Sequence, residues 1–311
     1  SEERDAAEAI PALTPIDDAT SHAVQAQYTA LPYPRWLSTR AIKPATRQAV
    51  MEAAVTGLPP EPALHDPAPL KILVAGCGTG KHAVDVATRF SDAGVLAIDL
   101  SRPSLGYAAC QAERLGIANI RFGVGDILQL GALDARFDHI EAMGVLHHLA
   151  DPLGGWAVLR SLLAPRGTMR IGLYSRRGRL AIKAAQLFAK DFSTEPEGLR
   201  EFRQAIYRLP PENPAAAVAR ELDFYTLSGA RDAFAHAQES DFDLMQIKSM
   251  LQELALAFAG FEFPTASPAE LFRKRFPERQ ALAALDNWHL LEQESPALFH
   301  HMYQFWCLAD D

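Results

Sequence analysis

The sequence is poor in cysteine and lacks any long apolar run. Its three cysteines, Cys77, Cys110 and Cys307, lie far apart, and their spacing matches no metal site. This odd, sparse set predicts reduced thiols and therefore a cytoplasmic protein. No apolar run approaches the roughly 20 residues that a membrane-spanning helix needs, so no membrane segment is predicted.

An excess of positive charge is also absent. The 30 lysines and arginines face 38 aspartates and glutamates, for a formal net charge of -8. This balance argues against tight, nonspecific binding to DNA or RNA, although a local basic patch could still hold a nucleic acid. The first residues, SEERDAAEAI, are acidic and polar, unlike a secretory signal. A chain that begins with Ser is expected to be a processed product or an excised fragment.

What is present is an ordinary globular composition, with 49% hydrophobic and 22% charged residues. Residues 1–60 are predicted to form an N-terminal arm and lid, and the arm is expected to be mobile to about residue 20. The stretch AQYTALPYPRW, residues 26–36, holds two prolines and three aromatics and is expected to be irregular. A helix is expected from about Thr46 to Thr56.

Between residues 61 and 175, short apolar runs alternate with helical segments. This alternation predicts a parallel sheet with helices on both faces. The predicted strands are Ile72–Ala75, Val95–Ile98, Ile120–Val124, His139–Met143 and Thr168–Leu173. Residues 176–252 are predicted to be a helical cap insertion. Residues 253–311 add strands at Leu256–Phe263 and Met302–Ala309, one of them reversed. The fold class is α/β, a Rossmann-like, seven-stranded, mostly parallel sheet.

The segment ILVAGCGTG, which follows Lys71, reads as a strand that enters a glycine-rich turn. Gly76, Gly78 and Gly80 let the backbone approach a ligand, and the free amides that open the next helix attract a negative group. Both dinucleotides and S-adenosylmethionine use such a turn. The dinucleotide fingerprint needs its third glycine one place later, where this chain has Lys81.

Two carboxylates follow the next strands. Asp99 ends the second strand, where it can accept hydrogen bonds from both ribose hydroxyls of either ligand. Asp126 follows the third strand, where it can meet an adenine amino group, with Ile127 packing beside the ring. The alternative role of Asp126 is to cap a turn or helix.

The blocks ILVAGCGTG, VLAIDLS, GDIL and the segment from Phe137 to Ser175 resemble the class I S-adenosylmethionine-dependent methyltransferases, in the same order. YPRW, HHLADP and the later DFYTLSGARDAFAHAQESDFDLMQIKSML resemble a bacterial subgroup that is often fused to tetratricopeptide repeats. The resemblance implies S-adenosylmethionine as cofactor, with Leu100 and Met143 among its contacts. Val74 departs from the pattern, because the family usually carries an acid there that helps to position the cofactor's ammonium group.

Two histidines follow the fourth strand. His147 and His148 are predicted beside the transferred methyl group, where either could accept a proton near neutral pH. The alternative is that one histidine holds the loop while the other packs nearby. No third residue at ligand spacing supports a metal site.

The YPRW segment is predicted to close over the site. Tyr28 and Tyr33 would cover the cofactor and substrate, and Arg35 would pair with the cofactor carboxylate or an anionic substrate. Alternatively, Trp36 docks this segment against the sheet.

The cap and the fifth strand supply the predicted substrate wall, at the carboxyl ends of the strands. Tyr174 ends the fifth strand. The cap candidates are Tyr225, Arg231, Asp232, His236, Gln238 and Glu239. Arg231 and Asp232 could instead be solvated or paired on a helix. The late residues Phe299 to Trp306 are expected to pack in the core.

The predicted function is therefore methyl transfer to a small molecule or to a side chain or terminus of a peptide. Two alternatives remain at this point. One is a nicotinamide-dependent oxidoreductase, and the other is a non-catalytic binding module that keeps the fold.

Overall fold

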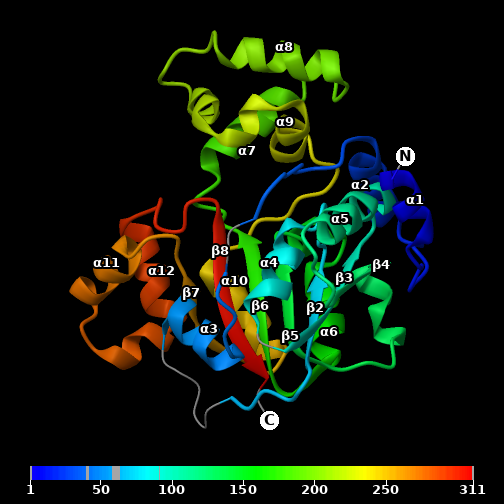
Figure 1. Ribbon diagram of the computed structural model, residues 1–311. Helices are drawn as coiled ribbons and strands as arrows, with labels where there is room; N and C mark the ends of the chain where they lie inside the picture. Colours follow the sequence, from blue (N-terminus) through cyan, green and yellow to red (C-terminus); the bar gives the residue numbers. More distant parts are fainter. Residues whose placement is uncertain (1, 40–41, 58–63, 91, 310–311) are drawn as a thin grey trace.

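The computed structural model describes residues 2–39, 42–57, 64–90 and 92–309, and it contains one large mixed sheet (Figure 1). The strand order is β1-β7-β8-β6-β5-β2-β3-β4. The strands are Val55–Gly57 (β1), Leu70–Ala75 (β2), Ala93–Asp99 (β3), Ile120–Val124 (β4), Phe137–Met143 (β5), Leu163–Tyr174 (β6), Leu256–Glu262 (β7) and Met302–Ala309 (β8).

The sheet confirms the predicted Rossmann-like arrangement. Strands β2 to β6 pair in parallel, while β8 lies antiparallel between β6 and β7. The short strand β1 adds an eighth strand, antiparallel to β7, which the sequence did not predict. The helix predicted at about Thr46 to Thr56 is α3, Arg47–Ala54, and it ends before β-branched Val55, whose backbone is extended.

Helices cover both faces of the sheet. Their bounds are Glu2–Ala9 (α1), Ala19–Ala30 (α2), Lys81–Arg89 (α4), Arg102–Arg114 (α5), Pro152–Ser161 (α6), Leu180–Ala189 (α7), Pro196–Ile206 (α8), Leu227–Phe234 (α9), Leu244–Glu253 (α10), Ser267–Arg275 (α11) and Leu285–Glu294 (α12). A first apolar cluster forms where α3, α4 and α5 pack on the sheet. A second forms where α6, α10, α11 and α12 pack on it.

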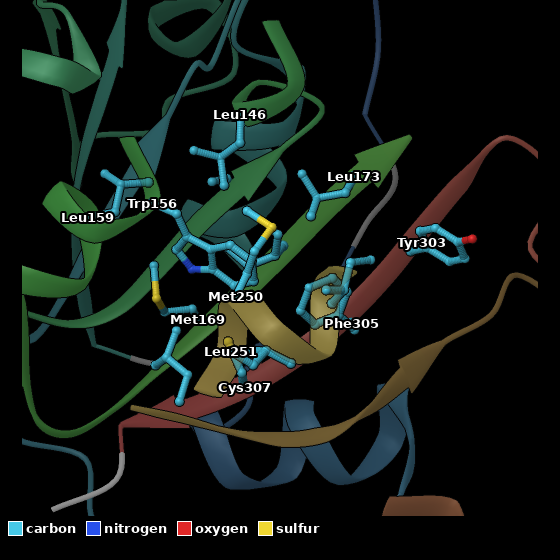
Figure 2. Packing of buried hydrophobic residues seen from close by; sticks show 14 of the residues in the cluster. Leu146, Trp156, Leu159, Met169, Leu173, Met250, Leu251, Tyr303, Phe305 and Cys307 are labelled. Carbon is cyan, nitrogen blue, oxygen red and sulfur yellow. The ribbon is translucent and has the colours of Figure 1, made fainter. Parts of the chain in front are cut away.

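Figure 2 shows part of the second cluster, where Trp156 and Met250 approach the sheet beside Phe305. Trp156 and Phe305 are completely buried. Burying a large apolar side chain stabilises the fold by about 1.5–3 kcal/mol, so this layer fixes the strands whose ends carry the candidate site. Among the described residues, no helix is long and apolar enough to cross a membrane.

The N-terminal arm is docked, which corrects the prediction of a mobile segment. Helix α1 packs on α5, where Gly106 has no side chain to hold it off: a Cβ there would lie 2.4 Å from the Glu3 carbonyl oxygen. Farther along, the Leu13 N–H donates to the Val124 carbonyl at 2.7 Å. Residues 26–30, expected to be irregular, are the last turn of α2.

The cap stands beyond the carboxyl ends of the parallel strands (Figure 1). Helices α7, α8 and α9 share a separate apolar cluster that includes Ile182, Phe202 and Phe234. The predicted cap ran to residue 252, yet the apolar face of α10 belongs to the core of the sheet. The predicted boundary at residues 60 and 61 lies outside the described residues.

Candidate functional site

A cavity of about 450 Å³ opens at the carboxyl ends of β2, β3, β4 and β5. The N-terminal segment and the cap complete its wall. The lining residues, by region, are Val24, Tyr28, Tyr33 and Pro34 from the N-terminal segment; Val74 to Thr79, Lys81, His82 and Asp85 from β2 and α4; Asp99, Leu100, Gly125, Asp126 and Ile127 after β3 and β4; Met143 to Val145, His148, Leu149 and Tyr174 after β5 and β6; and Asp232 from the cap.

The glycine turn brings backbone to the cavity wall. Gly76 and Gly78 line the cavity with positive φ angles of 70° and 53°. Gly80 also has a positive φ, but it lies outside the lining and serves helix packing, because a Cβ there would come 2.4 Å from the Ala108 Cβ. The structure therefore places Gly80, a predicted cofactor contact, at the close approach of α4 to α5.

Asp99 is fixed by backbone donors. Its Oδ2 accepts the Gly78 N–H and its Oδ1 accepts the Ser101 N–H, both at 2.8 Å. Burial raises the pKa of the Asp99 carboxyl, while these hydrogen bonds oppose the rise. The carboxylate therefore ties the glycine turn to the end of β3 and still lines the cavity, where its second lone pairs can accept ligand hydroxyls.

Asp126 caps a turn with one carboxylate oxygen and leaves the other without a partner. Its Oδ1 accepts the Leu128 N–H at 3.0 Å and caps the short 3-10 helix Ile127–Ala132. Its Oδ2 is buried and has no hydrogen-bond partner. A buried carboxylate oxygen without a donor is costly, and this one belongs to a residue in the cavity wall. A ligand amino group, such as that of adenine, would satisfy it.

The N-terminal segment is tied to the cap. The Tyr28 hydroxyl donates to Asp232 Oδ1 at 2.5 Å and lies 3.2 Å from His236 Nε2. The Tyr33 hydroxyl donates to Asp223. These contacts close one side of the cavity.

Arg35 and Trp36 do not reach the cavity. Arg35 is exposed and pairs with Glu3 at 2.6 Å, with its guanidinium 4.5 Å from the Tyr107 ring centroid. The structure therefore places Arg35, a predicted cofactor contact, outside the cavity lining and paired with a carboxylate on α1. Trp36 is buried and its Nε1–H donates to the Thr79 carbonyl at 2.8 Å, as the docking alternative expected.

Of the two histidines after β5, only one lines the cavity. His148 lines the cavity, and its Nδ1 lies 2.7 Å from the Gln238 carbonyl oxygen. Because a carbonyl only accepts, Nδ1 carries the proton and Nε2 of the neutral ring keeps a lone pair. Burial, and then His236, hold the pKa of His148 well below its ordinary value. His147 is completely buried, lies outside the lining, and stacks on Tyr174 with ring centroids 3.5 Å apart.

Only some of the predicted substrate residues line the cavity. Tyr174 lines the cavity, with the Arg179 guanidinium 3.5 Å from its ring centroid. His236 lies behind the wall, stacked on His148 at 3.7 Å. Tyr225 is 54% exposed and donates to the Ala219 carbonyl, so it does not face the cavity. Arg231 is also outside the lining.

Some lining residues were not predicted from the sequence. His82 and Asp85 lie on the first turns of α4, just after the glycine turn, and Val24 comes from α2. A helical spacing of three from His82 to Asp85 places both on one face, and this was the available signal. Among the described residues, no group of three or more His, Cys, Asp or Glu is arranged for a metal ion.

Comparison with known proteins finds a methyltransferase domain in the chain. A family model for the methyltransferase domain matches residues 72–167. The chain is 30% identical to an uncharacterized protein of Synechococcus sp., over 92% of this chain and 71% of that protein. It is 30% identical to trans-aconitate 2-methyltransferase of Deinococcus radiodurans, over 47% of this chain and 54% of that enzyme.

Among solved structures, PKMT2 from Rickettsia typhi in complex with AdoHcy has a similar fold, with a TM-score of 0.58 and 16% identity, over 80% of this chain and 52% of that one. The chain thus spans about half the length of the Deinococcus enzyme and of PKMT2. Residues 72–167 therefore form a class I S-adenosylmethionine-dependent methyltransferase domain. The glycine turn, Asp99 and the unpartnered Oδ2 of Asp126 fit the cofactor of that class.

Proposed function

We propose that the chain transfers the methyl group of S-adenosylmethionine to a nitrogen or oxygen atom that carries a proton, on a small molecule or a peptide. The observation that carries the proposal is the pair formed by Asp126 Oδ2, a buried acceptor without a donor, and His148, a neutral acceptor in the same cavity wall. Asp126 Oδ2 can accept a hydrogen bond from the adenine amino group, and His148 can take the proton of the group that receives the methyl.

The cofactor would lie along the carboxyl ends of β2 to β5. Asp99 would accept the ribose hydroxyls, Asp126 the adenine amino group, and Ile127 would pack against the ring. Gly76, Gly78, Leu100 and Met143 would complete its contacts, with Tyr28 and Tyr33 covering them. When bound, S-adenosylmethionine supplies a methyl group already activated by its positive sulfur, so the protein mainly orients the acceptor.

His148 would take the proton of the acceptor on Nε2. The Gln238 carbonyl fixes the tautomer in which Nε2 keeps its lone pair, and burial keeps the ring neutral, so Nε2 is available as a proton acceptor. His147, stacked behind Tyr174, would position the wall rather than touch the acceptor.

The charge of the cavity supports an uncharged or cationic acceptor. Asp85, Asp99, Asp126 and Asp232 line it, and Lys81 is the one lysine or arginine among the described lining residues. Lys81 is already held by Asp85 at 2.8 Å. Asp99 and Asp126 are assigned to the cofactor, so Asp232 is, among the described lining residues, the carboxylate without an ion pair that is left for the methyl acceptor. An anionic methyl acceptor would meet Asp232 without a free basic partner, whereas an amine or hydroxyl could donate a hydrogen bond to it. Tyr33 and Tyr174 would contact it, with His236 supporting the wall.

Titration calorimetry with S-adenosylmethionine, S-adenosylhomocysteine and NAD tests the proposal. We expect micromolar binding of the first two ligands and no heat with NAD. Heat with NAD alone would favour an oxidoreductase, and silence with all three would favour a non-catalytic module. Native mass spectrometry of the purified protein should then show a retained cofactor and any captured acceptor. Association with tetratricopeptide repeats and a cytoplasmic location stay predictions.

A further inference from the structure

Glu141 stands directly beside the position at which the chain departs from its family. Val74 on β2 occupies the place of the usual acidic residue, and its partner in the register of β5 is Glu141. Paired residues of neighbouring parallel strands project to the same face of the sheet. An acid is therefore present at this level of the sheet, displaced by one strand.

Glu141 is completely buried and held by three side chains. Its Oε2 accepts from Arg170 Nη1 at 2.9 Å and lies 2.6 Å from His82 Nε2, while its Oε1 lies 3.3 Å from His139 Nε2. Burial opposes its ionisation, but the charge of Arg170 and the hydrogen bonds from His139 and His82 hold the pKa of Glu141 well below its usual range. A buried ion pair is weak evidence for stability, so a role in positioning a neighbour is the better account of it.

His82 links this carboxylate to the cavity. It lies on the first turn of α4, lines the cavity with Val74 and Gly76, and its side chain is 29% exposed. An ionised carboxylate only accepts, so the imidazole Nε2 that contacts Glu141 carries the proton. In the neutral ring, Nδ1 then keeps a lone pair for a ligand.

We propose that His82, oriented by Glu141, binds the ammonium group of the amino-acid end of S-adenosylmethionine and replaces the acid missing at Val74. His82 Nδ1 accepts a hydrogen bond from the ammonium, and Glu141 accepts the Nε2 proton and adds its negative charge behind the ring. This inference rests on the proposed function, because it assigns one end of the same cofactor site.

Two ligands separate this inference from the proposed function. S-adenosylhomocysteine carries the amino-acid end, whereas 5′-methylthioadenosine keeps the adenosine and the sulfur but lacks that end. In calorimetry, His82→Ala should raise the Kd for S-adenosylhomocysteine about tenfold, the effect of losing a hydrogen bond to a charged group. The Kd for 5′-methylthioadenosine should not change. His289→Ala, a variant of a histidine on α12 outside the cavity, is the matched control.

The role of Glu141 is tested by a double-mutant cycle. Glu141→Gln should weaken S-adenosylhomocysteine selectively, and the double variant should bind no more weakly than His82→Ala alone, because Glu141 acts through His82. Arg170 keeps its pairing with Glu262 in these variants, and thermal unfolding checks that each one folds.

The outcomes are distinct. If the wild-type protein binds neither ligand, the proposed function fails. If it binds both, and His82→Ala weakens both equally or neither, the assignment of His82 is overturned while the cofactor site stands. Additive losses in the cycle would overturn the positioning role of Glu141.

Discussion

Tyr28 of α2 and Asp232 of α9 are joined by a 2.5 Å hydrogen bond, although 204 positions separate them in the chain. This bond joins the N-terminal segment to the cap at the wall of the cavity. Tyr28→Phe should lower the free energy of unfolding by about 1 kcal/mol and leave an acceptor without its donor. Chemical denaturation measures this effect.

The matched control for that change is Tyr225→Phe, which removes an exposed hydroxyl that bonds only the Ala219 carbonyl. It should cost clearly less, because water replaces the lost bond. Equal losses of unfolding free energy in the two variants would show that the hydrogen bond between Tyr28 and Asp232 stabilises the fold no more than an exposed one.

Asp232 gives the protein a pH dependence of defined sign. Burial, the largest cause, raises the pKa of its carboxyl from 3.8 to about 6. Between these values the folded state keeps a proton that the unfolded state releases, so the stability from Asp232 is lost as pH rises through this window. Relative to wild type, Asp232→Asn should therefore become more stable by about 2–3 kcal/mol between about pH 4 and pH 7. Urea denaturation at both pH values measures the stability of the variant relative to wild type. If this relative stability does not increase from about pH 4 to pH 7, the raised pKa of Asp232 is contradicted.

Asp126→Asn separates capping from ligand binding at a single side chain. The Asn Oδ1 can still accept the Leu128 N–H, but an NH₂ replaces the unpartnered Oδ2 and would face another donor on adenine. Stability should change little, and the Kd for S-adenosylhomocysteine should rise about tenfold or more. Asp151→Asn, at the exposed cap of α6, should leave the Kd unchanged. Unchanged binding by Asp126→Asn would remove Asp126 from the site.

His148→Gln should affect the reaction and spare the cofactor. Losing a general base lowers the rate by a factor on the order of 10²–10⁴, measured in single turnovers with the acceptor captured by the protein. Because the pKa of His148 is held well below 6.5, the wild-type rate should persist at about pH 6, where an unperturbed histidine is mostly protonated. A rate that falls with a midpoint near 6.5 would contradict the lowered pKa of His148, and an unchanged rate in His148→Gln would remove it as the general base.

Gly106→Ala should loosen the N-terminal helix. The new Cβ would lie 2.4 Å from the Glu3 carbonyl oxygen and 2.7 Å from the Ala7 Cβ, and such overpacking costs about 1–3 kcal/mol. Limited proteolysis should then cut residues 2–13 faster. Gly94→Ala, where no atom lies within 4 Å, should behave like wild type. Equal protection in both variants would show that α1 tolerates the clash.

The sheet and the turn could be predicted because their signals are local. Apolar runs marked β2 to β8, and the spacing of Gly76, Asp99 and Asp126 placed three residues at the ends of successive strands. Docking of α1 could not be predicted, since it depends on Gly106 meeting Glu3 across about a hundred residues. The sequence also did not show that Glu3 takes the charge of Arg35, or that Tyr225 points away from the cavity. Each of these outcomes is decided by tertiary neighbours rather than by residue type.

His148 depends on the cap through a main-chain atom. The acceptor of its Nδ1–H is the carbonyl of residue 238, which every amino acid possesses, and not the Gln side chain. The side chains of the cap can thus diverge to admit new acceptors while the orientation of the imidazole is conserved. Under the proposed function, selectivity for the methyl acceptor and the orientation of the proton-accepting His148 would be separately adjustable, although the cap contributes to both.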